Sequence, residues 1–271
     1  NAAVGASGDP GDGVVYTKRT KSQITAANAS TTCTSGITDM SYLWTGGFNE
    51  DIRSWDVSLV TTMQGMFQAS QFNQPLDNWD VSNVADMAAM FNGSQFNQPL
   101  NNWDVSNVTY MQQMFQDSQF NQPLDNWDVS SVTTMSDMFN VATSFNQSLG
   151  DWDVSNVTNM RYMFAYTAFN QPIGNWDVGN VIYISEMFYF ANSFNQPIGN
   201  WNVSNVIDIS FMFYGTPFNQ DISTWQFNSS VYLDEVVGQS GLDTNNYDAL
   251  LEAFSNQNLV NKNLGAQGLT Y

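Results

Sequence analysis

The chain has 271 residues, of which 14% are aromatic and only 11% are charged, and acidic residues so outnumber basic ones that the formal net charge is −19. A surface this acidic repels phosphate backbones and anionic lipids, which excludes nucleic acid as an expected partner. No apolar run reaches the length of about 18 residues that a membrane-spanning helix needs. We therefore expect neither nucleic-acid binding nor a membrane span.

The chain divides into three zones: a lead-in or cap over residues 1–36, a repeat array over 37–227, and a C-terminal cap over 228–271. The lead-in is rich in Gly, Ala, Ser and Thr and contains Cys33. Because Cys33 is the single cysteine, it cannot form an internal disulfide and says little about the redox compartment. The chain opens on Asn rather than Met, which suggests a processed or excised segment.

The array is built from one phrase, Phe-Asn-Gln-Pro-Leu-x-x-Trp-Asp-Val-Ser-Asn-Val-x-x-Met-x-x-Met-Phe, written about eight times. One tryptophan marks each copy, and successive tryptophans are 24 or 25 residues apart: Trp55, Trp79, Trp103, Trp127, Trp152, Trp176, Trp201 and Trp225. A period in the twenties is typical of a solenoid, in which each unit packs mainly on its neighbours. The sequence thus predicts one continuous array rather than separate domains.

Two shorter periods alternate inside each copy. Val84, Met87 and Phe91 share the spacing of one helical face, which predicts a short helical segment. Trp79 and Val81 alternate with polar residues, which predicts a short strand with one buried face. We therefore expect an α/β repeat with a short parallel strand and a short helical segment in each turn.

The C-terminal cap contains one expected amphipathic helix. Asp243 is positioned as an N-cap, and it precedes apolar residues at helical spacing, namely Tyr247, Leu250, Leu251 and Phe254. Solenoids need end caps that cover their last apolar layer. This helix is therefore interpreted as the element that closes the array.

The invariant residues are interpreted as structural. A tryptophan at the same phase of every turn favours core packing over a sugar-stacking platform. The methionine pairs have helical spacing and are expected to fill the core rather than to bind copper. The asparagine after each opening phenylalanine, such as Asn73 or Asn97, is expected to form a hydrogen-bonded ladder along the array.

The aspartates that follow the tryptophans leave two interpretations open. They are Asp56, Asp80, Asp104, Asp128, Asp153 and Asp177. Stacked carboxylates repel one another unless local hydrogen bonds to backbone N–H groups or a bound cation compensates. Local hydrogen bonds are the preferred interpretation, because Asn202 and Gln226 replace aspartate late in the series. Calcium between neighbouring turns is the alternative.

No catalytic constellation is recognisable in the sequence. There is no histidine, and neither a phosphate-binding glycine loop nor a zinc-ligand spacing is present. Repetition already explains most of the carboxylates. We therefore expect no catalytic residue, no cofactor and no enzymatic activity.

The positions that vary between copies are the candidates for function. In the later copies they carry aromatic residues where earlier copies are mostly polar or small: Tyr162, Tyr166, Tyr183, Tyr189, Phe190, Phe211 and Tyr214. If these phases face solvent, they form an aromatic patch suited to partner binding or self-association. The alternative is that some of them pack beneath the longer loops.

The phrase FNQPLDNWDVSNV and the Met-x-x-Met-Phe box at residues 111–115 resemble the BspA-like branch of the leucine-rich-repeat proteins. The resemblance implies a leucine-rich-repeat-like, right-handed solenoid of about eight 24–25-residue turns. It also implies a bacterial protein exported to the cell surface, with adhesion or recognition of a protein or glycan as its role. It brings no catalytic residues. The alternative is a structural subunit that self-associates into a filament or surface layer.

Overall fold

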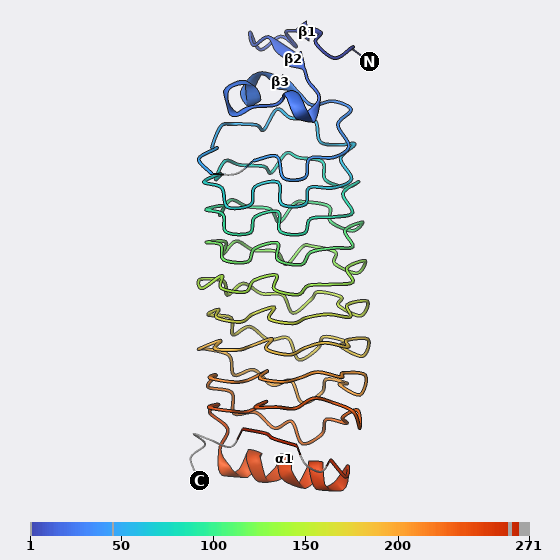
Figure 1. Ribbon diagram of the computed structural model, residues 1–271, viewed down its shortest axis with the longest axis vertical. Coiled ribbons are helices and arrows are strands. Elements are labelled where there is room, and N and C mark those ends of the chain that lie inside the picture. Colours follow the sequence, from blue (N-terminus) through green and yellow to red (C-terminus); the bar gives the residue numbers. More distant parts are fainter. Residues whose placement is uncertain (1, 45, 260–261, 266–271) are drawn as a thin grey trace.

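The computed structural model shows a rod of stacked coils, with the N-terminal segment at one end and a helix at the other (Figure 1). The structure describes residues 2–44, 46–259 and 262–265. Each coil corresponds to one copy of the repeat and hydrogen-bonds to the copies before and after it. The chain is therefore a repeat solenoid, as the period of the tryptophans predicts.

The N-terminal end carries a three-stranded sheet in the order β1-β2-β3. Strand β1 (Ser7–Gly8) is antiparallel to β2 (Tyr16–Lys18), and β2 is parallel to β3 (Thr32–Cys33). Two 3-10 helices, η1 (Lys21–Gln23) and η2 (Ala26–Thr31), connect β2 to β3. This small unit lies on the first coil and ends the stack on that side (Figure 1).

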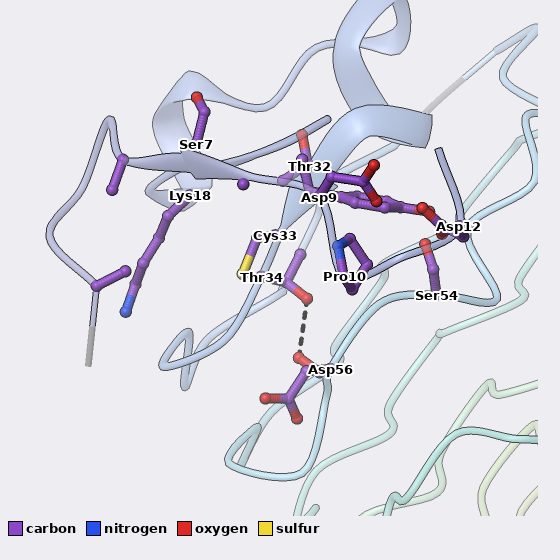
Figure 2. A pocket seen from close by; sticks show the side chains of 14 residues that line it. Ser7, Asp9, Pro10, Asp12, Lys18, Thr32, Cys33, Thr34, Ser54 and Asp56 are labelled. Atoms are coloured by element: carbon purple, nitrogen blue, oxygen red, sulfur yellow. Dashed lines mark hydrogen bonds between the residues drawn. The ribbon is translucent and has the colours of Figure 1, made fainter. Parts of the chain in front are cut away.

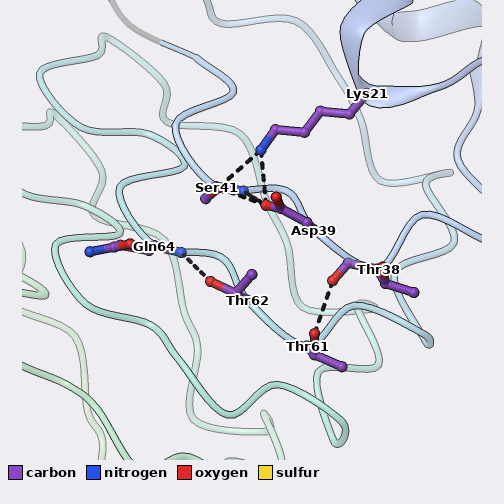
Figure 3. Close-up of polar contacts among 7 residues, drawn as sticks. All are labelled: Lys21, Thr38, Asp39, Ser41, Thr61, Thr62 and Gln64. Atoms are coloured by element: carbon purple, nitrogen blue, oxygen red, sulfur yellow. Dashed lines mark hydrogen bonds and ion pairs between the residues drawn. The ribbon is translucent and has the colours of Figure 1, made fainter.

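Polar contacts join this N-terminal unit to the array (Figure 3). The ammonium group of Lys21 donates to the carboxylate of Asp39 and to the hydroxyl of Ser41, each at 2.9 Å. One coil further on, the Thr61 hydroxyl donates to the backbone carbonyl of Thr38 at 3.2 Å. The lead-in is thus held to the first coil by an ion pair, and the first coil to the second by hydrogen bonds.

The core is a continuous aromatic and aliphatic column inside the coils. Trp103 is only 3% exposed, and its indole N–H donates to the carbonyl of Leu76, one coil earlier, at 3.0 Å. The same bond recurs from Trp55 to Trp225. Phe91 stacks on its counterpart Phe115 with ring centroids 5.7 Å apart. The core interpretation of the tryptophans is therefore confirmed, since a buried indole with its N–H satisfied is not a sugar platform.

The helical segment predicted at residues 84–91 is wrong. The N–H of Met87 donates to the carbonyl of Tyr110 at 3.0 Å, and that of Ala89 to Gln112 at 2.9 Å, both in the next coil. In an α-helix these N–H groups would bond within their own segment. Ala89 also has a φ of +54°, which a right-handed helix does not contain. The segment is a series of β-turns whose alternate N–H groups connect neighbouring coils.

The strand predicted at residues 79–81 is also wrong. Hydrogen bonds from Trp79 N–H to the Leu76 carbonyl at 3.1 Å and from Val84 N–H to the Val81 carbonyl at 2.9 Å close a turn on each side. Pairing occurs further along each coil, as single-residue parallel bridges at Asp39, Thr62, Asp86, Tyr110, Thr134, Asn159, Tyr183, Asp208 and Tyr232. The alternation of buried and exposed residues that suggested a strand arises at a corner between two turns.

The expected asparagine ladder is confirmed. The side-chain carbonyl of Asn73 accepts the backbone N–H of Asn97 at 2.9 Å and the side-chain amide of Gln98 at 3.1 Å. The same arrangement links the copies from Asn49 to Asn219. Each asparagine thereby satisfies a backbone donor that the coil itself leaves unpaired.

The structure has a helix, α1 (Thr244–Asn256), where the sequence predicts one. The carboxylate of Asp243 accepts the N–H of Asn246 at 3.0 Å, which is an N-cap. Leu250 and Phe254 are buried against the end of the array. Among the described helices, none is long and apolar enough to cross a membrane.

Candidate functional site

Each coil crosses one face of the rod as consecutive β-turns whose third residue is left-handed. In one late coil, turn 184–187 closes with a 3.3 Å hydrogen bond and has Glu186 at φ +59°. Turn 188–191 closes at 2.8 Å and has Phe190 at φ +50°. We call the surface formed by these paired turns the turn face, and the two residues the first and second left-handed positions. The same pair of positions recurs in the other coils.

Left-handed backbone favours glycine, because any Cβ is crowded there. Glycine fills one of the two positions in coils towards either end of the array, at Gly65, Gly93 and Gly215. The coils between them carry larger side chains instead: Gln113, Asp117, Asp137, Val141, Tyr162, Tyr166, Glu186 and Phe190. Each such residue costs roughly 1 kcal/mol relative to ordinary helical backbone. The central coils therefore present side chains on the turn face at a cost to stability.

Five of the predicted aromatic residues meet on this face and form what we call the aromatic cluster: Tyr166, Tyr189, Phe190, Phe211 and Tyr214. Tyr166 stacks on Phe190 with centroids 5.6 Å apart, and Tyr189 stacks on Tyr214 at 5.5 Å. An edge-to-face contact between Tyr166 and Tyr189 at 5.5 Å joins the two pairs. Tyr166 is 45% exposed, and the other four are half-buried against one another.

Tyr162 occupies a first left-handed position, and the carboxylates of Asp137 and Glu186 occupy that position in the coils on either side. Burial, with the neighbouring Glu186 carboxylate, raises the pKa of the Tyr162 hydroxyl. Burial likewise raises the pKa of the Glu186 and Asp137 carboxyls. Carboxyls with raised pKa values lie where too little positive charge compensates their burial. This part of the turn face therefore holds two part-buried carboxyls, neither of which forms an ion pair among the described residues.

Tyr183 lies outside the aromatic cluster and contacts an arginine. The guanidinium carbon of Arg161 is 5.2 Å from the centroid of the Tyr183 ring. The same guanidinium donates to the Ser185 hydroxyl at 2.8 Å and forms an ion pair with Asp208, two coils away. Sequence reasoning did not single out Arg161 or Asp208. The available signal was that Arg161 is the one basic residue between Arg53 and Lys262.

The aspartates after the tryptophans make local contacts. The Asp80 carboxylate accepts the Ser82 hydroxyl at 2.6 Å and the Ser82 N–H at 3.1 Å, and these bonds lower the pKa of Asp80. Asp56 accepts the hydroxyl and the N–H of Ser58, and Asp153 accepts the N–H of Ser155 at 3.0 Å. Side-chain and backbone hydrogen bonds from these serines lower the pKa of both aspartates. In the described part of the chain, no three acidic, histidine or cysteine side chains converge on a point that could hold a metal.

A pocket of about 460 Å³ lies between the N-terminal unit and the first coil (Figure 2). Its acidic groups are engaged within their own loop, since Asp9 accepts the N–H of Gly11 at 2.7 Å and Asp12 accepts the Tyr16 hydroxyl at 3.0 Å. Cys33 is half-buried on the pocket wall. The pocket therefore offers few free polar groups for a ligand, and the turn face is the better candidate site.

Comparison with known protein families agrees with the repeat architecture. The family described as "Mycoplasma protein of unknown function, DUF285" matches residues 15–120, 91–179 and 151–250. The chain belongs to this family. The three DUF285 matches overlap and together run from residue 15 to residue 250, as expected where one unit is repeated along a solenoid. No curated protein matches the chain.

Proposed function

We propose that this DUF285 protein is a non-enzymatic recognition module that binds a protein or glycan partner through its turn face. The protein would act outside the cell or on the cell surface, and its role there would be adhesion. The proposal also places the repeats in the BspA-like branch of the leucine-rich-repeat proteins, on the strength of the FNQPLDNWDVSNV phrase.

The observation that carries the proposal is the aromatic cluster at strained positions. Tyr166, Phe190 and Phe211 have φ values of +57°, +50° and +56°, at positions where most other coils have glycine, alanine or a polar residue. Such strain is retained at functional sites when the side chain that it presents is needed. A contiguous aromatic surface on a polar rod is also the usual composition of an interface centre. The recurring Phe, Leu, Trp, Val and Met residues of the repeated phrase are buried and serve the core.

The test is a protein and glycan array probed with the full chain and with a variant in which Tyr166, Tyr189 and Tyr214 are changed to serine. We expect the hits of the native chain to be lost in the variant. The matched control changes Tyr110 and Tyr232 to serine, since these tyrosines are 46% and 67% exposed and lie outside the aromatic cluster. Equal binding by the native chain and both variants would show that the turn face is not the binding surface.

Self-association is the second candidate, because an exposed aromatic surface can also be covered by another copy. The net charge of −19 opposes it, since two copies repel each other. Sedimentation velocity over a range of protein and salt concentrations separates the two functions. A monomer at every concentration favours recognition of a partner, and concentration-dependent filaments favour a structural subunit.

A further inference from the structure

We propose that the turn face binds a cationic partner, namely a protein segment whose arginine or lysine side chain lies on the aromatic cluster and pairs with the carboxylate of Glu186. This inference rests on the proposed function and names the chemistry of its partner. Three observations carry it: the chain's own Arg161 is held on this face, carboxylates outnumber cations around it, and the partly exposed rings of the aromatic cluster lie beside them.

The first observation is that the turn face already holds one guanidinium. Arg161 lies 5.2 Å from the centroid of the Tyr183 ring and is paired with the Asp208 carboxylate. Ser185 accepts a further hydrogen bond from it at 2.8 Å. A ring face and a hydroxyl from one coil and a carboxylate from the next thus form a complete arginine site. The spacing of the coils suits this kind of ligand, because guanidinium combines stacking on a ring with directional hydrogen bonds.

The second observation is that the carboxylates of this region outnumber its cations. Asp137, Glu186 and Asp208 all lie around Arg161, and the electrostatic influence of Arg161 reaches both Asp137 and Glu186. No other basic residue occurs between Arg53 and Lys262. Asp208 is paired with Arg161, whereas neither Asp137 nor Glu186 forms an ion pair within the part of the chain that the structure describes. Among the same residues, Asp137 accepts only a neutral hydrogen bond from the Asn140 amide at 3.0 Å, and Glu186 only one from the Tyr162 hydroxyl. A bound cation would neutralise the charge of these two carboxylates, whereas a neutral glycan would leave it in place.

The third observation is that the aromatic rings lie next to one of these carboxylates. Tyr189 follows Glu186 by three residues in the same coil, and its N–H donates to the Glu186 carbonyl at 3.1 Å. After burial and the neighbouring Tyr166 and Tyr214, the Glu186 carboxylate also contributes to the raised pKa of the Tyr189 hydroxyl. Tyr166 is 45% exposed, so part of its ring is open to a ligand. A cation placed on an aromatic ring is stabilised by the ring quadrupole and more so beside a carboxylate. A second copy of this chain is disfavoured here because it carries the same charge of −19.

The test is a titration of the full chain with a fluorescently labelled peptide in which arginine alternates with glycine, followed by anisotropy at low and at physiological salt. The matched probe replaces every arginine by citrulline, which keeps the shape and removes the charge. A neutral oligosaccharide is the third probe. Of the three probes, we expect only the arginine peptide to bind, with an affinity that falls as the salt concentration rises.

Two variants locate the contact. Glu186→Gln removes the charge at the site, and we expect it to weaken the arginine peptide about two- to fivefold. Tyr189→Leu keeps an apolar side chain and removes the ring, with a loss of similar size expected. Glu50→Gln is the matched control, because Glu50 is an exposed glutamate at the start of the array. Unfolding midpoints of all variants are measured together, so that a loss of binding in a fully folded Glu186→Gln protein supports the inference.

The outcomes separate the inference from the proposed function. Equal binding of the citrulline and arginine peptides, or equal weakening by Glu186→Gln and Glu50→Gln, overturns the cationic partner. In another outcome, the native chain binds the oligosaccharide and not the arginine peptide, and this binding is lost when Tyr166, Tyr189 and Tyr214 are changed to serine. That result overturns the cationic partner but supports recognition by the turn face. If the serine variant still binds the arginine peptide, the turn face is not the binding surface. Both the proposed function and the cationic partner are then overturned.

Discussion

The ring of Phe190 lies directly against the backbone of Gly215, one coil later on the turn face. A Cβ at Gly215 would be 2.6 Å from Cδ1 of Phe190, and the φ of Gly215 is +72°. Gly215→Ala should therefore destabilise the protein by about 2–4 kcal/mol, through overpacking and left-handed strain together. Chemical denaturation followed by tryptophan fluorescence measures this loss.

Gly93→Ala is the control for that experiment, because Gly93 has a similar φ of +66° but its nearest neighbouring atom, the Ala69 Cα, would be 3.6 Å from a new Cβ. It should lose about 1 kcal/mol, from strain alone. Phe190→Ala should recover part of the stability of the Gly215→Ala protein, since it removes the clashing ring. Equal losses at Gly93 and Gly215 would contradict the contact.

The asparagine ladder predicts an unequal response of two asparagines in the same part of the array. Asn97→Ala leaves the N–H of Asn121 and the side-chain amide of Gln122 without the acceptor that now lies 2.9 and 3.2 Å away. The expected loss is about 1–3 kcal/mol. Asn126→Ala changes an exposed asparagine and should stay within about 0.5 kcal/mol of the native protein. Comparable midpoints for the two variants would exclude a structural ladder.

The sequence was sufficient for the core and the ladder, because both depend on residues that recur at one phase. It was misleading for residues 84–91, since a chain of β-turns can bury the same spacing of apolar residues as a helix. A clue was present at Gly65, inside a segment predicted to be helical, and at Gly93 and Gly215, two residues after such segments. Glycine is disfavoured in helices but favoured at left-handed turn positions.

The candidate site was predictable only in part. Aromatic residues that replace polar ones at a fixed phase indicated the aromatic cluster. The pairing of Arg161 with Asp208 was not accessible, because the two are 47 residues apart and meet only when the arginine side chain reaches across an intervening coil. The left-handed backbone at Tyr162 and Glu186 was equally hidden, since neither residue type favours that conformation.

The contact of Lys21 with Asp39 predicts a pH-dependent attachment of the N-terminal unit (Figure 3). The hydrogen bonds from Lys21 and then Ser41 lower the pKa of Asp39 to about 2. Because the folded pKa lies below the unfolded value of about 3.9, the contribution to stability is present above that value and is lost as the pH falls towards about 2. The side chains are 33% and 55% exposed, so the contribution is below about 1 kcal/mol.

Lys21→Met should therefore lower the unfolding temperature at pH 7, and the difference from the native protein should close as the pH approaches about 2. Lys18→Met is the matched control, because it removes the same charge from a lysine that makes no ion pair among the described residues. Thermal unfolding followed by circular dichroism checks both. A deficit of constant size at every pH would exclude the ion pair as its cause.

Glu186 predicts the opposite dependence on pH. Burial raises its pKa, so the folded protein retains the proton to a higher pH than the unfolded chain does. The resulting contribution to stability is present at low pH and is lost as the pH rises through the folded pKa. Glu186→Gln should thus make the protein more stable at neutral pH, by less than about 1 kcal/mol for a part-exposed group, and the gain should vanish in acid.

Asp153→Asn provides the contrast, because hydrogen bonds from Ser155 lower the pKa of Asp153. Its stability contribution is present at neutral pH and is lost in acid, so this variant should be less stable than the native protein at pH 7 and approach it at low pH. Urea midpoints of both variants at several pH values give the two slopes. A Glu186→Gln protein that is destabilised at neutral pH would show that the carboxylate is already compensated within the fold, and the turn face would then have no need of a cation from a partner.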